Sequence, residues 1–227
     1  FKKNIEVDSD KSISIRSLLI SSISQGSSLV KNTLESEDVL SAINCLKKLG
    51  VKITKSKRGE YLISGKGLGS LQIKKYNKLN FGNSGTLARL LIGILSTTPN
   101  IRVNLSGDHS LNRRNMKQLI ELMSQFGAQF NPKNKFKFPL RLISSELPIK
   151  INYKAGISAQ LKSAVILAGL NSYGNTVISE IERSRDHTEN MLLDNSRVIK
   201  IKNKRIKVIT IFGKKNLDPL KINVPGD

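Results

Sequence analysis

Apolar residues gather in three long runs, and each run follows a short stretch of small polar residues. The polar stretches are DKSIS (10–14), GNSGT (82–86) and GISAQ (156–160). The pattern predicts that each polar stretch begins an apolar helix. Breaking residues then stop the helices, at Gly26, Thr98–Asn100 and Gly174. A short β-rich segment follows each break, at residues 27–32, 101–107 and 175–181.

In each of the three segments, the pattern then predicts a second helix. Acidic or hydroxyl residues precede it, at 36–38, 108–110 and 184–186. Such residues favour helix starts because their side chains accept hydrogen bonds from free backbone N–H groups. Two of these helices are expected to end in glycine, at Gly50 and Gly127. Further strands are predicted at EYLISG (60–65), LQIKK (71–75), KFPLRLI (137–143) and LPIKINY (147–153).

The three segments recur at a nearly constant period. The first helix starts, at Ser12, Asn83 and Ser158, are 71 and 75 residues apart, and the caps of the second helices, at Ser36, Asp108 and Ser184, are 72 and 76 residues apart. The sequence therefore predicts an α/β fold of three repeated β-α-β-α-β-β units around a pseudo-threefold axis, with helices inside. The units are expected at about 8–80, 81–153 and 154–227.

This arrangement has a chemical consequence. The N-terminus of a helix carries roughly half a positive charge and several unpaired N–H groups. If the three units are equivalent, three such ends meet on one face, and an anion-binding site is expected there.

Composition limits the class of protein. The 227 residues are 38% apolar, enough for a sizeable core, and contain no apolar run long enough for a membrane span or a signal peptide. The single Cys45 lies on an apolar helical face and is interpreted as a buried thiol, which fits a reducing cytoplasm. The net charge of +21 is compatible with nucleic-acid binding. The lysines are spread along the chain without interleaved aromatic residues, so most are interpreted as solvated charges.

Several motifs resemble the enolpyruvyl transferases, in particular the branch that acts on shikimate 3-phosphate. The similar stretches are DKSISIR (10–16), GNSGTLAR (82–89), LSGDHSLNRRNM (105–116), SAQLKSAVILAGL (158–170), SRDHTE (184–189) and VPGD (224–227). They occur in the family's order over almost the whole chain. The family has two domains of three units each, and the chain crosses between them twice. The resemblance implies that 8–227 form one complete domain and that 1–7 are a strand or linker belonging to the other domain.

The resemblance implies a reaction. The enolpyruvyl group of phosphoenolpyruvate is transferred to the 5-hydroxyl of shikimate 3-phosphate, and phosphate is released, a step of aromatic amino acid biosynthesis. No metal and no cofactor are expected. The partners are the two small substrates and the second domain, which carries the family's acid/base residues, so the isolated domain is expected to be inactive. A membrane partner is not expected.

The resemblance also implies which residues hold shikimate 3-phosphate. They are Lys11, Ser12, Arg16, Ser158, Ala159, Gln160, Ser184 and Arg185. A structural interpretation stays open for several of them: Ser12 as a helix cap, Arg16 as a surface charge, and Ser184 or Asp186 as the cap of the next helix.

A second set is implied for phosphoenolpyruvate. It comprises Lys11, Asn83, Gly85, Thr86, Arg114 and Gln160, with Lys11 and Arg114 as the catalytic cations. The alternatives are a turn and cap for 83–86, and a salt bridge to a helix acid for Arg114. In this family the herbicide glyphosate occupies the phosphoenolpyruvate position close to the glycine, where a methyl group would crowd it.

Three departures from the family pattern stand out: Asp8–Ser9 for Pro-Gly, Ile15 for His, and Asn115 for Pro. Three other functions remain open. A UDP-N-acetylglucosamine enolpyruvyl transferase usually has Lys-Asn in place of Lys11–Ser12 and a loop cysteine as acid, whereas Cys45 falls in a predicted helix. A basic nucleic-acid-binding or RNA-processing domain rests on the charge alone. A non-catalytic domain would bind only shikimate 3-phosphate.

Overall fold

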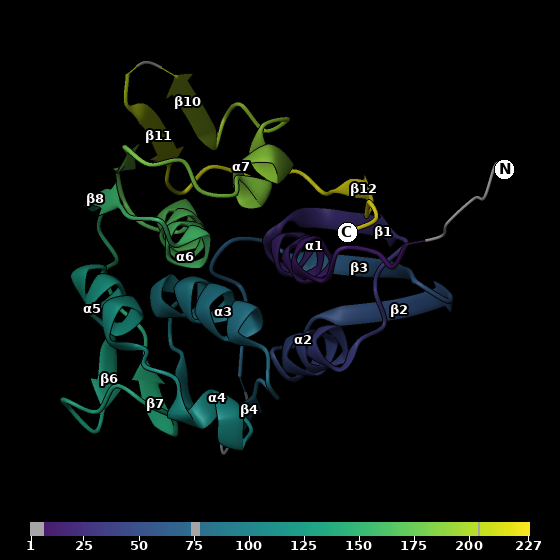
Figure 1. Cartoon of the computed structure of the whole chain (residues 1–227), viewed down its shortest axis with the longest axis horizontal. Helices are drawn as coiled ribbons and strands as arrows, with labels where there is room; N and C mark the ends of the chain where they lie inside the picture. Colours follow the sequence, from purple (N-terminus) through teal and green to yellow (C-terminus); the bar gives the residue numbers. More distant parts are fainter. Residues whose placement is uncertain (1–6, 74–77, 204) are drawn as a thin grey trace, which may run out of the picture.

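The computed structural model describes residues 7–73, 78–203 and 205–227. Three helices occupy the middle of the molecule (Figure 1): α1 (Lys11–Ile23), α3 (Gly85–Thr97) and α6 (Ala159–Leu170). Nearly all their residues are buried: α3 and α6 are mainly apolar, and in α1 most of the serines are buried together with the apolar residues. At Gly93 a Cβ atom would lie 2.6 Å from the backbone oxygen of Ala164, so the glycine allows α3 and α6 to approach closely.

Three four-stranded sheets surround these helices. In spatial order, the first sheet contains β12 (Lys221–Asn223), β1 (Gln25–Lys31), β3 (Glu60–Lys66) and β2 (Lys52–Lys57). The second contains β4 (Lys78–Asn80), β5 (Arg102–Ser106), β7 (Leu140–Ile143) and β6 (Gln129–Asn131). The third contains β8 (Asn152–Ala155), β9 (Asn175–Glu180), β11 (Lys207–Phe212) and β10 (Ile199–Asn203).

All three sheets have the same topology. The first two strands in each order are parallel, and the other neighbours are antiparallel. Alternation sets the buried face: in β5, Val103 and Leu105 are buried while Arg102 and Asn104 are exposed. The predicted α/β class, the repeated β-α-β-α-β-β unit and the interior helices are confirmed.

The outer helices differ between the units. They are α2 (Glu37–Lys48), α4 (His109–Arg113), α5 (Lys117–Gln125) and α7 (His187–Leu192). Cys45 is buried in α2, which confirms its interpretation as a buried thiol. Burial raises the pKa of this thiol to about 12. The single second helix predicted after Asp108 is wrong, because the chain turns extended at Arg114 and starts again as α5. Asn115 Oδ1 accepts a hydrogen bond from the Lys117 N–H at this second start.

One predicted strand is also wrong. Residues 71–73 of LQIKK form no strand, and 74–75 lie outside the described residues. Leu71 is buried in a loop that covers the core, so its apolar character reflects packing rather than a sheet. The loop follows turns at Gly67 and Gly69, whose φ angles of +83° and +72° favour glycine.

The first sheet is completed by the last strand of the chain. β12 pairs in parallel with β1, just as β4 pairs with β5 and β8 with β9. The Asp10 N–H donates to the Pro225 oxygen and the Asp227 N–H donates to the Asp8 oxygen, both at 2.9 Å. Residues 8–10 and 225–227 therefore lie side by side. Of the segment 1–7, residues 1–6 lie outside the described residues.

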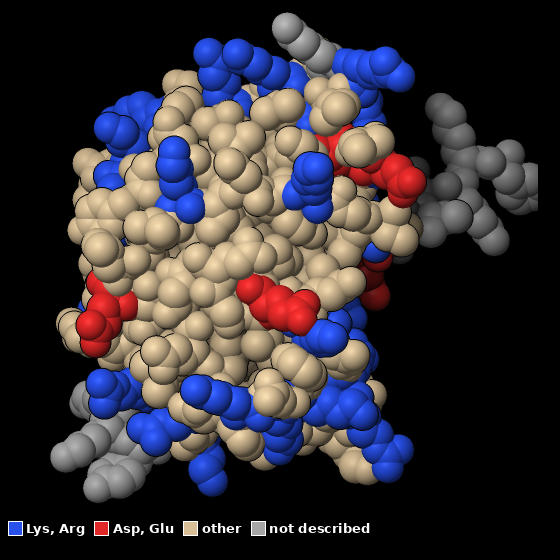
Figure 2. All heavy atoms as spheres, turned by 90° about the vertical axis from the view of Figure 1, so that its left-hand side faces the viewer, with Lys and Arg blue, Asp and Glu red and all other residues tan. Residues whose placement is uncertain are grey.

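The basic residues are dispersed over the surface. On the face shown in Figure 2, lysines and arginines are scattered and are densest along the upper and lower margins, while mostly neutral residues, with a few acidic ones, lie between them. This distribution agrees with the interpretation of most lysines as solvated charges. No helix within the described residues has the length and apolar character needed to cross a bilayer.

Candidate functional site

A pocket of about 280 Å³ lies where the starts of α1 and α6 meet the loop before α7. Its lining residues are Ser12, Arg16, Ile157, Ser158, Ala159, Gln160, Ser184, Arg185 and His187. The structure thus brings together seven of the eight residues expected to hold shikimate 3-phosphate. These residues come from the first and third units, so the pocket exists only because the units pack against each other.

Arg16 is the buried cation of this pocket. Only 3% of the residue is exposed, so its interpretation as a surface charge is wrong. Its guanidinium donates to Thr188 Oγ1 at 3.0 Å, to the Ser12 backbone oxygen at 3.1 Å and to Ser12 Oγ. Burial lowers the pKa of Arg16 to about 10, which still leaves it charged at neutral pH. Its hydrogen-bond partners are neutral oxygens, and the carboxylates of Asp10 and Glu189 act on its charge without forming a salt bridge with it among the described residues.

The starts of the central helices are not equivalent. Ser158 caps α6 and accepts from the Leu161 N–H at 3.4 Å, and Ser84 caps α3 in the same way. In α1 the cap is Asp10, which accepts from the Ile13 N–H at 2.6 Å, so the interpretation of Ser12 as the cap is wrong. A carboxylate at that end opposes an added anion. The expectation of three equal anion-binding ends is therefore corrected to two neutral caps and one acidic cap.

Apart from Lys11, the residues expected to bind phosphoenolpyruvate lie around the start of α3. Arg114 Nη2 donates to Asn83 Oδ1 at 3.0 Å, and Gln160 Nε2 donates to Thr86 Oγ1 at 3.0 Å. The second bond joins the starts of α3 and α6, so the two substrate sets are neighbours.

Two arginines crowd the start of α3. A Cβ atom at Gly85 would lie 2.8 Å from Nη1 of Arg114 and 2.8 Å from Nη1 of Arg89. Arg89 Nη1 also donates to the Gly85 oxygen at 3.1 Å. Burial and the nearby Arg114 lower the pKa of Arg89. Among the described residues, no carboxylate forms a salt bridge with Arg114, so the alternative of a bridge to a helix acid is not observed.

Lys11 lies apart from the pocket lining. Its Nζ is 3.2 Å from Asp38 Oδ2 at the start of α2, and its side chain is 51% exposed. An exposed ion pair of this kind contributes little free energy. A dianionic ligand can therefore compete for the ammonium group.

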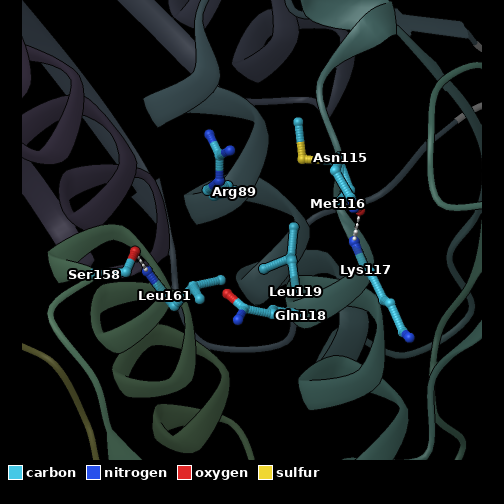
Figure 3. Close-up of a pocket in the computed structure, with 8 residues that line it drawn as sticks. All are labelled: Arg89, Asn115, Met116, Lys117, Gln118, Leu119, Ser158 and Leu161. Carbon is cyan, nitrogen blue, oxygen red and sulfur yellow. Dashed lines mark hydrogen bonds between the residues drawn. The ribbon is translucent and has the colours of Figure 1, made fainter.

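A second cavity, of about 350 Å³, shares Ser158 with the first pocket (Figure 3). Its lining includes Arg89 from α3 and Lys117 and Gln118 at the start of α5. The sequence reasoning did not include Lys117 and Gln118. The sequence feature that could have indicated them is the stretch NMKQ (115–118), which directly follows Arg114.

His187 also lines the first pocket and, like Ile157, was not selected from the sequence. It begins α7, and its Nδ1 is buried without a hydrogen-bond partner in the described part of the chain. Burial and the charge of Arg16 lower the pKa of the imidazole, which favours the neutral form.

The threefold architecture, with helices inside and three sheets around them, is that of a domain of the enolpyruvyl transferase type. The chain belongs to the EPSP synthase family, because the sequence model described as "EPSP synthase (3-phosphoshikimate 1-carboxyvinyltransferase)" matches residues 1–227.

Comparison with individual proteins supports the same family. The chain is 37% identical over 228 residues to the 3-phosphoshikimate 1-carboxyvinyltransferase of Ruegeria sp. (strain TM1040), covering 100% of this chain and 50% of the relative. It is 41% identical over 221 residues to the enzyme of that name from Magnetococcus marinus (strain ATCC BAA-1437 / JCM 17883 / MC-1), covering 96% of this chain and 48% of the relative. It is also similar to the solved EPSP synthase from Acinetobacter baumannii, with a TM-score of 0.89 and 35% identity over 100% of this chain and 50% of that one. The chain thus spans about half the length of these relatives.

Proposed function

We propose that this chain supplies the shikimate-3-phosphate-binding half of a 3-phosphoshikimate 1-carboxyvinyltransferase. In the reaction, the 5-hydroxyl oxygen of shikimate 3-phosphate bonds to the enolpyruvyl group of phosphoenolpyruvate, and inorganic phosphate leaves. The observation that carries the proposal is the 280 Å³ pocket, which joins the hydroxyls of Ser158 and Ser184 to the guanidinium groups of Arg16 and Arg185. Hydroxyls and guanidinium groups suit a ligand with a phosphate and a carboxylate.

The proposed roles follow from the chemistry of each group. Ser158, Ala159, Ser184 and Arg185 receive the phosphate of shikimate 3-phosphate, whereas Ser12 and Arg16 face its carboxylate and hydroxyls. Gln160 reaches from this group toward phosphoenolpyruvate.

Phosphoenolpyruvate is assigned to the start of α3. Asn83, Gly85 and Thr86 line its position, and Arg114 holds it with a planar fork suited to phosphate or carboxylate. Lys11 leaves Asp38 and bridges the two substrates. Placing these cations around both anions stabilises charge that develops during transfer.

A second domain, provided by the rest of the full-length protein, completes the active site. It is proposed to bring the acid/base groups and to close over this domain, which removes water from the reacting atoms. A reducing cytoplasm is the proposed compartment.

The test compares the full-length protein with residues 1–227 alone. The full-length protein is expected to release phosphate only when both substrates are present. The 1–227 chain is expected to bind shikimate 3-phosphate weakly in calorimetry and to release no phosphate. Shikimate without its phosphate is the control ligand and should bind more weakly still. Absence of phosphate release by the full-length protein would contradict the proposed reaction, and robust release by 1–227 alone would contradict the role of a second domain.

A further inference from the structure

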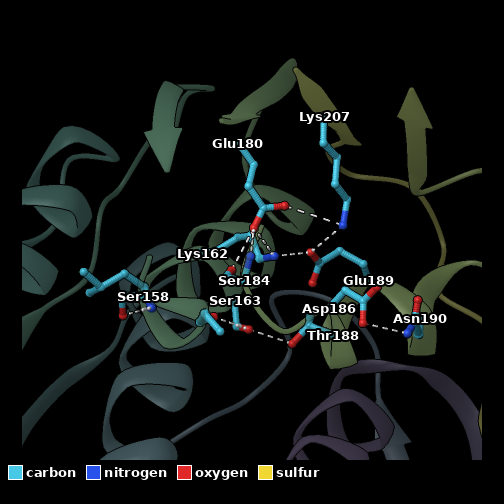
Figure 4. Close-up of polar contacts among 12 residues, drawn as sticks. Ser158, Lys162, Ser163, Glu180, Ser184, Asp186, Thr188, Glu189, Asn190 and Lys207 are labelled. Atoms are coloured by element: carbon cyan, nitrogen blue, oxygen red, sulfur yellow. Dashed lines mark hydrogen bonds and ion pairs between the residues drawn. The ribbon is translucent and has the colours of Figure 1, made fainter. Parts of the chain in front are cut away.

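Four buried charged side chains lie together beside the pocket, and the proposed reaction uses none of them. They are Lys162 from α6, Glu180 at the end of β9, Glu189 from α7 and Lys207 from β11 (Figure 4). The side chains of Lys162, Glu180 and Glu189 are fully buried, and that of Lys207 is 11% exposed. Lys162 Nζ lies 2.7 Å from Glu180 Oε1 and 2.7 Å from Glu189 Oε1. Lys207 Nζ lies 3.5 Å from an oxygen of each carboxylate.

Stability alone does not explain this cluster. Burying a charge costs several kcal/mol of solvation, and well-packed apolar residues of similar volume are often as stabilising as a buried ion pair. Glu189 Oε2 also has no hydrogen-bond partner among the described residues. The contacts that the cluster makes beyond itself therefore indicate its role.

Glu180 connects the cluster to the pocket through Ser184. Besides Lys162, its Oε1 atom accepts from the backbone N–H of Ser184 at 2.8 Å and from the Ser184 hydroxyl at 2.8 Å. Burial alone would raise the pKa of Glu180, but the hydrogen bonds from Lys162 and Ser184 lower it to about 2, so the acceptor is a carboxylate at neutral pH. Both donors of Ser184 are thus held by one charged oxygen.

This contact is the main attachment of the loop between β9 and α7. Residues 181–185 form no backbone–backbone hydrogen bonds within the described part of the chain. Arg185 is exposed, and the cap residue Asp186 accepts no side-chain capping bond. Without Glu180, little else would fix where the Ser184 hydroxyl and the Arg185 side chain lie along the pocket wall.

Glu189 offers an internal comparison. It has the same burial as Glu180 and the same 2.7 Å distance to Lys162, but it has no contact with Ser184. Its neighbour Thr188 accepts from Arg16 and donates to Ser163 Oγ at 2.9 Å. The two carboxylates are therefore alike in burial and in their distance to Lys162, but only Glu180 holds Ser184, whereas the charge of Glu189 acts on Arg16.

We propose that Glu180, neutralised by Lys162, is a positioning residue that fixes the Ser184–Arg185 segment for the phosphate group of shikimate 3-phosphate. The proposal rests on the function proposed above. Glu180 touches no substrate, so its loss should raise the KM for the substrate whose phosphate this segment receives. The KM for phosphoenolpyruvate and kcat should be unchanged, because the start of α3 does not depend on this loop.

The test uses two double variants of the full-length protein with the same composition. Lys162→Met/Glu180→Leu removes the tether of Ser184, whereas Lys162→Met/Glu189→Leu keeps it. Each variant removes one positive and one negative charge and leaves Lys207 beside the remaining carboxylate, at 3.5 Å in the parent structure. The first should raise the KM for shikimate 3-phosphate by about tenfold, since two hydrogen bonds to a charged group are lost. The second should stay within about twofold of the parent, and melting temperatures should match.

Equal KM values for shikimate 3-phosphate in the two double variants would overturn the positioning role, whether both rise or neither does. If the double variants do not fold, the single variants Glu180→Leu and Glu189→Leu decide in the same way, because each removes one carboxylate together with its acceptor oxygens. A rise confined to Glu180→Leu supports the proposal, and equal values contradict it. Parent turnover is measured first: a parent protein without turnover contradicts the proposed function, whereas normal parent turnover with matching variants contradicts only the role of Glu180.

Discussion

The starts of α3 and α6 occupy the same place in successive units, yet their surroundings differ. Both helices begin with a serine cap that accepts from the N–H three residues on, at 3.3 Å for Ser84 and 3.4 Å for Ser158. The next residue is Gly85 in α3 and Ala159 in α6. In α3 the space of the missing methyl group is taken by two arginine ends. In α6 the following turn instead carries the buried Lys162.

The difference concerns how positive charge is placed. At α3 the guanidinium groups of Arg89 and Arg114 lie beside the helix start and donate to neutral oxygens. Both side chains can therefore turn toward an anion and pair with it. At α6 the nearest charge, Lys162, is buried and paired with Glu180 and Glu189, and the helix start itself lines the pocket with uncharged residues, among them Ser158 and Gln160. In the proposed function, the start of α3 would hold its ligand through cations with neutral partners, whereas the start of α6 would hold its ligand through fixed polar groups.

The largest expected effect is that of Gly85→Ala in the full-length protein. The added methyl group would lie 2.8 Å from both arginine ends, which are flexible and would move away. We expect the KM for phosphoenolpyruvate to rise by roughly ten- to a hundredfold, the equivalent of about 1–3 kcal/mol. We also expect the inhibition constant of glyphosate to rise by a larger factor than the KM, because glyphosate is the longer molecule. The melting temperature should be unchanged or higher, because alanine suits a helix better than glycine.

The matching change in α6, Ala159→Gly, is the control for this prediction. It should lower stability by roughly 0.5–1 kcal/mol and leave the phosphoenolpyruvate KM unchanged. A fall in melting temperature for Gly85→Ala would show that the glycine serves backbone geometry, and equal losses for glyphosate and phosphoenolpyruvate would contradict the steric argument.

Local signals explain what the sequence could predict. Polar caps before apolar runs and glycines after helices are short-range patterns, and they located the three units and the helix starts. The break at Arg114 was missed because no proline or glycine marks it. The strand proposed at 71–75 failed because an apolar residue in a covering loop has the same local pattern as one in a strand.

The buried charge cluster required the structure. Its four members come from α6, β9, α7 and β11, and their pairing depends on how these elements pack. The one local signal was Lys162 inside an apolar helical run, since a fully buried lysine requires a partner. The sequence did not indicate that the partners would be Glu180 and Glu189, nor that Ser184 would share one of them.

A smaller effect is expected at Arg114, which tests whether the cations at α3 act by geometry as well as charge. Arg114→Lys keeps the charge but replaces a planar fork with a single ammonium group. We expect the KM for phosphoenolpyruvate to rise by about tenfold, as a charged hydrogen bond is lost, while the KM for shikimate 3-phosphate stays constant. Arg113→Lys is the matched control, because Arg113 is exposed and adjacent but, unlike Arg114, makes no side-chain hydrogen bond to the start of α3 within the described residues. An unchanged KM in Arg114→Lys together with a lower melting temperature would assign the residue a structural role instead.

The smallest effects are expected at the cap residues Ser84 of α3 and Ser158 of α6. Both serines cap a helix, but they differ in whether they line the pocket. Ser84→Ala and Ser158→Ala each remove a cap of almost the same length, so each should lower stability by about 1 kcal/mol, or the melting temperature by about 2–4 °C. Only Ser158 lines the 280 Å³ pocket. Ser158→Ala should therefore also raise the KM for shikimate 3-phosphate by about two- to tenfold, the value of one neutral hydrogen bond. Thermal unfolding and substrate titration of the two variants, side by side, measure both quantities. If Ser84→Ala raised that KM as much as Ser158→Ala, the effect would come from helix fraying, and the distinction between the two helix starts would fail.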